Sequence, residues 1–228
     1  MSTDDPLDSG LDASTRLASR PGRSPVAAAV AGLVFSVILI VTLVLLHLAV
    51  GDSVVNAEWA SQPERRRMVA MATSLIPFAG ISFLWFIGVL RTRLGEREDK
   101  LFAAVFLGSG LLFVAMLFAG ASALATLLAV LERGGSVGSD TVVALQALTR
   151  ELTGTFGARM AAVFMISTSS VGLRSRILAR WLVVLGYAFG LILLLTPPLP
   201  RWGQLVFPTW VLLVSLAILA HSRRTAAE

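Results

Sequence analysis

Cysteine is absent from this chain of 228 residues, which contains only two histidines, His47 and His221, and one lysine, Lys100. The lack of cysteine excludes disulfides, thiolate nucleophiles and cysteine-ligated metals. The histidines belong to apolar segments far apart in sequence, near what we expect to be opposite membrane faces, so they do not share one haem iron. No carboxylate interrupts the hydrophobic part of any predicted span. We therefore expect no metal or other cofactor and no enzyme activity.

Charge is scarce too: charged residues make up 14% of the chain and hydrophobic residues 56%. An average soluble domain carries about 25% charged residues, so this composition is typical of a membrane protein. The basic residues are almost all arginine, which with the load of Ala, Gly, Val and Leu is typical of GC-rich bacterial coding. We read the basic excess as a topology signal and expect no nucleic-acid partner.

Long uncharged runs separate the charged turns. A hydrocarbon core about 30 Å thick needs about 20 apolar residues in a helix, and residues 101–131 form a run of 31 without any charge. The pattern predicts an all-α, polytopic transmembrane bundle of about six spans in a bacterial inner (cell) membrane, with the lipid bilayer as its solvent. The expected spans are 25–50, 68–90, 101–131, 152–173, 178–196 and 204–220, between a disordered tail at 1–24 and a short tail at 223–228.

The basic residues also predict an orientation. With the N-terminus inside, twelve basic residues face the cytoplasm and seven face outward, which favours an N-in, C-in arrangement. The triplet Arg65, Arg66 and Arg67 departs from this rule, because it falls in an outer loop. It is a candidate contact for an anion or a partner, although Glu58 and Glu64 would neutralise part of its charge.

Local signals mark three features of the helices. Ser61 followed by Pro63 and Glu64 is typical of a helix start, with Ser61 as the cap. A glycine-rich turn at 132–140 ends the third span, and Ser139 or Asp140 is expected to cap the next helix. Pro77 falls near the middle of the second span, where it would bend the helix.

Small residues recur along the third span at spacings of three, four and seven. Such a stripe lets helices approach closely, so we expect this span to be central and the most protein-contacted. The stripe comprises Ala104, Gly108, Ala115, Ala119, Ser122 and Thr126.

A polar region interrupts the fourth span. Arg159 falls about 21 Å from the inner end of this span, and Glu151 and Thr155 precede it on the same helical face. Further along, Ser167 and Ser170 delimit a run of four hydroxyl residues. These hydroxyls either bond to their own helix or, with Arg159 and Glu151, line a cavity for a polar or anionic headgroup.

Four strings resemble a family of uncharacterised bacterial six-span membrane proteins. They begin at Ile76, Arg97, Arg159 and Val206 with IPFAGISFLWFIGV, REDKLFAAVFLGSGLLF, RMAAVFMISTS and VFPTWVLLVS, and the likeness covers roughly residues 70–220. The resemblance implies an integral membrane protein and no particular activity.

Three classes of function fit the sequence to different degrees. A non-enzymatic accessory subunit, packed against a membrane-protein partner or a second copy of itself, or a binder of lipid or small molecules, fits the small-residue stripe and the scarcity of catalytic groups. A small transporter or permease component is the alternative, although no acidic residue lies inside a span to carry a proton or cation. An intramembrane enzyme is the least favoured.

Overall fold

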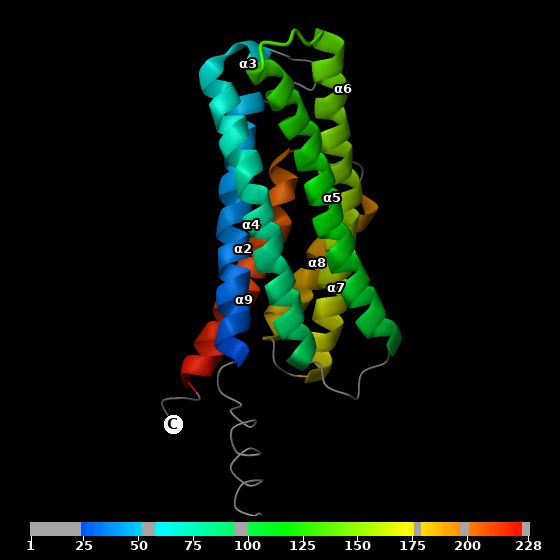
Figure 1. Cartoon of the computed structure of the whole chain (residues 1–228). Coiled ribbons are helices and arrows are strands. Elements are labelled where there is room, and N and C mark those ends of the chain that lie inside the picture. The colour runs from blue at the N-terminus through cyan, green and yellow to red at the C-terminus, as the bar shows by residue number, and fades with distance from the viewer. Residues whose placement is uncertain (1–23, 52–57, 94–99, 176–178, 197–200, 225–228) are drawn as a thin grey trace, which may run out of the picture.

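The computed structural model describes residues 24–51, 58–93, 100–175, 179–196 and 201–224, and almost all of these residues are helical. Figure 1 shows them as an elongated bundle. The described elements are, in chain order, α2 (Ser24–Val50), α3 (Glu58–Ser61), α4 (Pro63–Arg93), α5 (Lys100–Glu132), α6 (Ser139–Arg150), the π-helix η1 (Glu151–Gly157), α7 (Ala158–Ser175), α8 (Arg180–Leu195), the 3₁₀ turn η2 (Arg201–Leu205) and α9 (Val206–Arg224).

Five helical segments are long and apolar enough to cross a membrane: Val26–Val50, Pro63–Arg91, Ala103–Glu132, Ser139–Leu173 and Trp202–Ala220. They overlap five of the six expected spans. The remaining one, at 178–196, corresponds to α8, an apolar helix of 16 residues and therefore about 24 Å long. The tails predicted at 1–24 and 223–228 lie largely outside the described residues.

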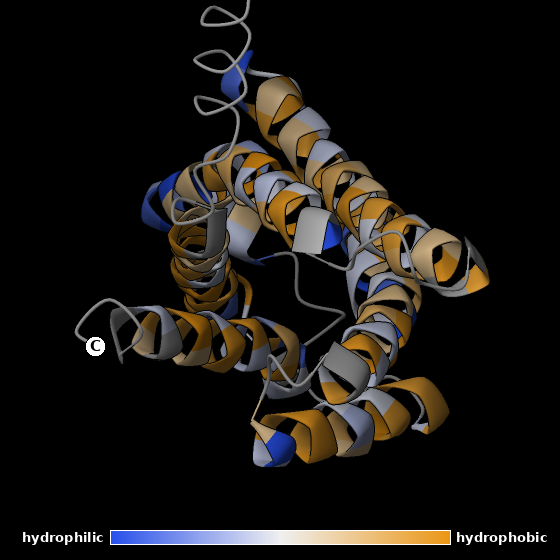
Figure 2. Ribbon diagram, turned by 90° about the horizontal axis from the view of Figure 1, so that it is seen from below, coloured by the Kyte–Doolittle hydropathy of each residue, from blue (hydrophilic) through white to orange (hydrophobic). Residues whose placement is uncertain are grey.

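The helices run alternately up and down the bundle (Figure 1). The first residue of α2 and the last turn of α9 lie at one end, and α3 lies at the other with the turn between α5 and α6. We call these the termini end and the α3 end. Helix α2 packs mainly on α4 and α9, and α7 packs mainly on α8. Seen from the termini end, hydrophobic residues lie on the outside of the bundle as well as the inside (Figure 2), which suits helices surrounded by lipid.

Backbone geometry explains where two of the helices end. Gly51 has a φ of 69°, and its N–H donates to the carbonyl of His47, which terminates α2. Gly134 has a φ of 76°; its N–H donates to Leu131 while that of Gly135 donates to Val130, the Schellman pattern. The glycine-rich turn predicted after the third span is therefore confirmed.

The predicted caps were wrong in their residues. The Ser61 hydroxyl donates back to the Glu58 carbonyl at 2.7 Å, inside α3, while Pro63 does occupy the first position of α4. The cap residue of α6 is Gly138, without a side-chain bond, and Ser139 is already helical. In both cases the helix began one residue away from the hydroxyl that the sequence pattern favoured.

Phenylalanine rings fill the middle of the bundle. Phe83 of α4 contacts the rings of Phe35, Phe113, Phe164 and Phe207, with centroids 4.5 to 5.6 Å apart. The rings come from α2, α4, α5, α7 and α9, so this cluster holds five helices together. Since lipid is as apolar as these side chains, the gain comes from close packing of the rings and not from exclusion of water.

Close helix contacts occur at glycines that receive a side chain from a neighbouring helix. Ser215 of α9 packs on Gly32 of α2, and Ser169 of α7 packs on Gly186 of α8. Between α5 and α6, the Thr149 hydroxyl donates to the Gly120 carbonyl at 3.1 Å. Small residues thus mediate helix contact, as membrane packing requires.

The stripe predicted for the third span was wrong. Of its six members, Gly108 is half-buried and the rest are exposed on α5. The buried face of α5 instead carries Phe106, Ser109, Gly110, Phe113 and Leu117. The segment Ser139–Leu173, and not α5, buries the largest share of its residues among the five long segments.

Candidate functional site

Two neighbouring cavities lie among α2, α5, the α6–η1–α7 segment and η2. The first has a volume of about 80 Å³ and lies toward the α3 end; the second has about 40 Å³ and lies nearer the bundle centre. Leu43, Thr153 and Gln204 line both, so these three side chains lie between the two spaces. Along α2 their lining runs from Val50 to Leu39, which is about 17 Å of helix.

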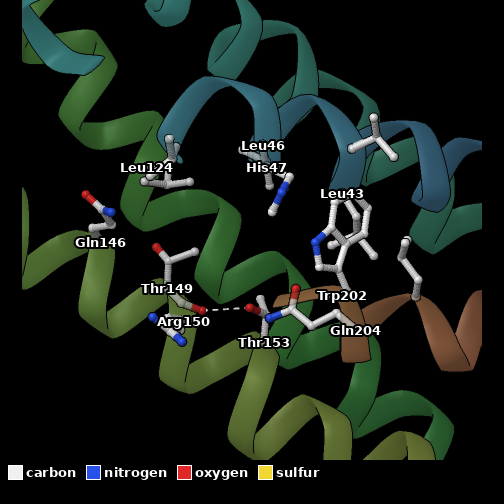
Figure 3. Close-up of a pocket in the computed structure, with 13 residues that line it drawn as sticks. Leu43, Leu46, His47, Leu124, Gln146, Thr149, Arg150, Thr153, Trp202 and Gln204 are labelled. Carbon is white, nitrogen blue, oxygen red and sulfur yellow. Dashed lines mark hydrogen bonds between the residues drawn. The ribbon is translucent and has the colours of Figure 1, made fainter. Parts of the chain in front are cut away.

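The first cavity carries polar side chains from several elements (Figure 3). His47 of α2 lies beside the indole of Trp202, with ring centroids 4.1 Å apart. Thr149, Arg150 and Gln146 line the opposite wall from α6. Arg150 supplies a permanent positive charge, and no carboxylate belongs to the lining among the described residues. Anionic groups are therefore favoured over cations in this cavity.

The second cavity is lined by hydrocarbon. Its apolar walls come from Leu39, Leu117, Leu193 and Ala161, and its floor is formed by Phe113 and Phe207. The centroids of these two rings are 4.8 Å apart in an edge-to-face arrangement. Because Phe35 and Phe83 pack against both rings, the cavity is closed toward the termini end by the phenylalanine cluster.

The π-helix η1 shapes the wall where the cavities meet. Its seven residues, Glu151–Gly157, interrupt an otherwise continuous α6–α7 helix, and Thr153 and Gly157 line the second cavity. Gly154 presents bare backbone, on which the amide of Gln204 lies; a Cβ there would be 2.8 Å from the Gln204 nitrogen. Short π-segments inside α-helices occur frequently at functional sites.

A buried hydrogen bond fixes the far wall of the first cavity. Trp59 of α3 is 1% exposed, and its indole N–H donates to Oε1 of Gln146 at 3.1 Å. The bond joins residues 87 apart in sequence and ties α3 to α6 at the α3 end. Trp59 also belongs to a small apolar cluster with Val50, Val69 and Leu127, so this wall is packed as well as bonded.

The structure places Arg159 outside both cavities. Its guanidinium donates to the carbonyl of Thr155 at 3.3 Å, one turn closer to the α3 end. Glu151 is exposed, and within the described residues no ion pair joins it to Arg159. Arg159 thus reaches along its own helix, as a long side chain does when it snorkels.

The serine-rich run is a helix contact. Ser167 and Ser169 are buried, and the Ser170 hydroxyl bonds to Tyr187 of α8 at 2.8 Å and to the Ile166 carbonyl at 2.9 Å. Ser169 packs on Gly186. Neither Ser167 nor Ser170 lines the two cavities.

Arg65, Arg66 and Arg67 lie in the first turns of α4, at the α3 end. Arg65 and Arg66 are half-buried and Arg67 is exposed. None of the three lines the two cavities, and neither do Glu151, Arg159, Ser167 and Ser170.

The side chains that do meet were not predicted as a site. His47, Gln146, Arg150, Trp202 and Gln204 come from α2, α6 and η2, and their proximity depends on tertiary packing. One local signal was present in the sequence: two glycines flanking a threonine and a phenylalanine at 154–157, which mark an irregular turn inside a helix. Among the described residues, no group of three or more metal-ligating side chains gathers.

By the length and composition of its helices, this is a multi-pass membrane protein. No protein-family model, curated protein or solved structure matches the chain. The resemblance to a family of six-span bacterial proteins is therefore not supported by these comparisons, and the class rests on the helices alone.

Proposed function

We propose that this protein spans the membrane six times with both termini in the cytoplasm, and that it binds an amphipathic molecule from the outer leaflet without chemically changing it. The observation that carries the binding proposal is the pair of adjoining cavities, the first with polar side chains among apolar ones toward the α3 end and the second almost wholly apolar toward the bundle centre. With volumes of about 80 and 40 Å³ the two spaces are smaller than a lipid, so they suit a small amphipathic molecule or one end of a larger one.

The number and direction of spans rest on two supports. Because α2 begins and α9 ends at the same end of the bundle, an even number of crossings is needed, and α8 supplies the sixth (Figure 1). The basic residues favour the termini end as the cytoplasmic one, by twelve to seven. The α3 end, with the first cavity, then faces outward.

The chemistry of the lining supports binding without catalysis. Among the described residues, it offers one imidazole, one guanidinium, amides and hydroxyls, with no carboxylate or thiol to form a catalytic pair with His47. The Thr149 and Thr153 hydroxyls already donate to backbone carbonyls. This set suits recognition by hydrogen bonds and charge.

A transporter is the second candidate, and the phenylalanine floor favours it. Two adjoining cavities that lie toward the proposed outer face and end at Phe113 and Phe207 have the form expected of one state of an alternating-access cycle. Transport would require these rings to separate, which is measurable as ligand movement into proteoliposomes. Saturable uptake would favour the transporter, and binding without uptake would favour the binder.

The test is to purify the protein in mild detergent and identify co-purifying lipids by mass spectrometry. Leu43→Trp fills the junction of the two cavities, because Leu43 lines both. Val41→Trp on the same helix is the matched control, since Val41 is exposed. We expect an amphiphile to be retained by the parent and by Val41→Trp and lost from Leu43→Trp. Equal retention by all three, or none in the parent, would contradict the proposal.

A further inference from the structure

Three side chains lie between the two cavities, and they differ in how firmly each is held. Leu43 belongs to the interior of α2, a helix of 27 residues. The Thr153 hydroxyl donates to the carbonyl of Thr149 at 2.8 Å, which ties this side chain to its own helix. Gln204, which lies beside Thr153 in Figure 3, belongs to η2, a turn of five residues. Its side chain is the longest of the three and comes from the shortest element.

The Gln204 amide rests against the backbone of Gly154. A Cβ built on Gly154 would lie 2.8 Å from the amide nitrogen, so the amide takes up space that any larger residue would fill with its own side chain. Among the described residues, the amide makes no hydrogen bond that would hold it in this place. Because a side chain held by packing alone changes rotamer within nanoseconds when it has space, little opposes a turn of this amide away from Gly154.

The turn that carries Gln204 is anchored on both sides. Before it, Trp202 lies against His47 of α2, with ring centroids 4.1 Å apart. After it, Phe207 at the start of α9 packs on Phe113 of α5, with ring centroids 4.8 Å apart. Both anchors hold the backbone of η2 in place. The part of η2 that is free to move between the two cavities is therefore the Gln204 side chain and not the turn.

We propose that Gln204 is a gate between the two cavities. With its amide on Gly154 the two spaces are separate, and with the amide turned away they form one space. The gate rests on the proposed function, because it controls whether the apolar end of a small amphipathic molecule passes from the first cavity into the second. The amide that leaves Gly154 then pairs with the polar end of that molecule, which favours the open position when the site is occupied.

The experiment measures the reactivity of single cysteines in the purified full-length protein, whose parent has no cysteine. Thr149→Cys reports on the first cavity and Ala161→Cys, at a position 1% exposed, reports on the second. The reagent is sulfonatoethyl methanethiosulfonate, which is small and anionic and therefore stays out of detergent and lipid. We expect Ala161→Cys to react about tenfold more slowly than Thr149→Cys or slower still, because a minor open state is populated to about 10% or less.

Two substitutions open the gate by different means. Gln204→Ala removes the amide, and Gly154→Ala places a methyl group where the amide rests. Each should raise the rate at Ala161→Cys about tenfold and leave the rate at Thr149→Cys unchanged. Leu205→Ala is the matched control, because Leu205 is the next residue of the same turn and lines the first cavity but not the second. It should leave Ala161→Cys slow.

Three results would overturn the gate. The first is an Ala161→Cys that reacts as fast as Thr149→Cys with Gln204 in place, since the spaces would then be continuous already. The second is an Ala161→Cys that stays slow in Gln204→Ala, since the other two side chains would then close the passage alone. The third is an equal acceleration by Leu205→Ala, since a loosened turn would then explain the effect.

Leu193→Cys, which lines the second cavity from α8, replaces Ala161→Cys if that variant does not fold. Reactivity is measured without any ligand, so the gate and the proposed function fail separately. A parent that retains no amphiphile contradicts the proposed function whatever the labelling rates are. Labelling rates that do not respond to Gln204→Ala contradict the gate even where an amphiphile is retained.

Discussion

Gly120 and Gly108 on α5 allow a direct test of the packing that forms the cavity wall. A Cβ built at Gly120 would lie 2.8 Å from Cγ2 of Thr153 and 3.4 Å from the carbonyl oxygen of Thr149. A Cβ at Gly108 would meet nothing within 4 Å. Gly120→Ala and Gly108→Ala are therefore the same substitution on the same helix, and they differ in what the added methyl group contacts.

We expect Gly108→Ala to stabilise the protein by about 0.5–1 kcal/mol, because alanine has less conformational freedom to lose in a helix. Gly120→Ala gains the same term but forces α5 and the α6–η1 segment apart, and overpacking of this kind costs about 1–3 kcal/mol. The two variants should differ by about 2 kcal/mol, or about 4–8 °C in Tm for a chain of this size.

A third variant identifies the cause. Thr153→Ser removes Cγ2 and keeps the hydroxyl, which donates to the Thr149 carbonyl at 2.8 Å. Combined with Gly120→Ala, it should recover most of the lost Tm. Thermal unfolding in one detergent, monitored by tryptophan fluorescence, measures all four proteins. If Gly120→Ala were as stable as Gly108→Ala, the close approach of α5 to η1 would be refuted.

Three further predictions concern single side chains. Arg159→Leu should raise Tm, because insertion of arginine at this depth costs up to about 2.5–3.5 kcal/mol. It should leave ligand binding unchanged, because Arg159 lines neither cavity. Loss of binding would show that Arg159 belongs to the binding site. A double-mutant cycle of Trp59→Phe and Gln146→Leu should show a coupling of about 1 kcal/mol in the free energy of unfolding. Additive effects of the two substitutions would contradict the hydrogen bond between these residues. Ser170→Ala should lower the free energy of unfolding by about 0.6 kcal/mol, because its hydrogen bond to Tyr187 is lost. Ser169→Ala should not lower it, because the Ser169 hydroxyl has no hydrogen-bond partner among the described residues. Equal losses in the two variants would contradict both assignments.

Sequence reasoning located the long spans because the bilayer imposes a length and a polarity on any helix that crosses it. It missed the buried face of α5. Small residues at regular spacing predicted a contact stripe, but the phenylalanines at 106 and 113 proved better partners for the rings of other helices, and the stripe faces outward. The choice between two faces of an apolar helix depends on neighbours that the local sequence does not contain.

Trp210 shows the same limit. A tryptophan near the start of a span is typical of the aromatic belt at the membrane surface, yet Trp210 is 1% exposed and donates its indole proton to the Leu182 carbonyl of α8. Trp202, eight residues earlier, is exposed but lies against the His47 ring, with the two ring planes tilted by 52°. Arg159 was predicted as a site residue because its depth in the span can be counted from the sequence. Arg150 lines a cavity only because α2 and η2 pack near α6, which the sequence does not indicate.

Labelling of single cysteines tests the six-span, outward-facing arrangement most directly, because the parent has no cysteine and gives no background. Cysteine is introduced at Ser136 in the α5–α6 turn, at Thr149 in the first cavity and at Ala227 near the C-terminus, and intact cells are treated with a membrane-impermeant maleimide. We predict labelling of Ser136→Cys and Thr149→Cys in intact cells, and of Ala227→Cys only after permeabilisation. Labelling of Ala227→Cys in intact cells, or protection of Thr149→Cys from the outside, would contradict this arrangement.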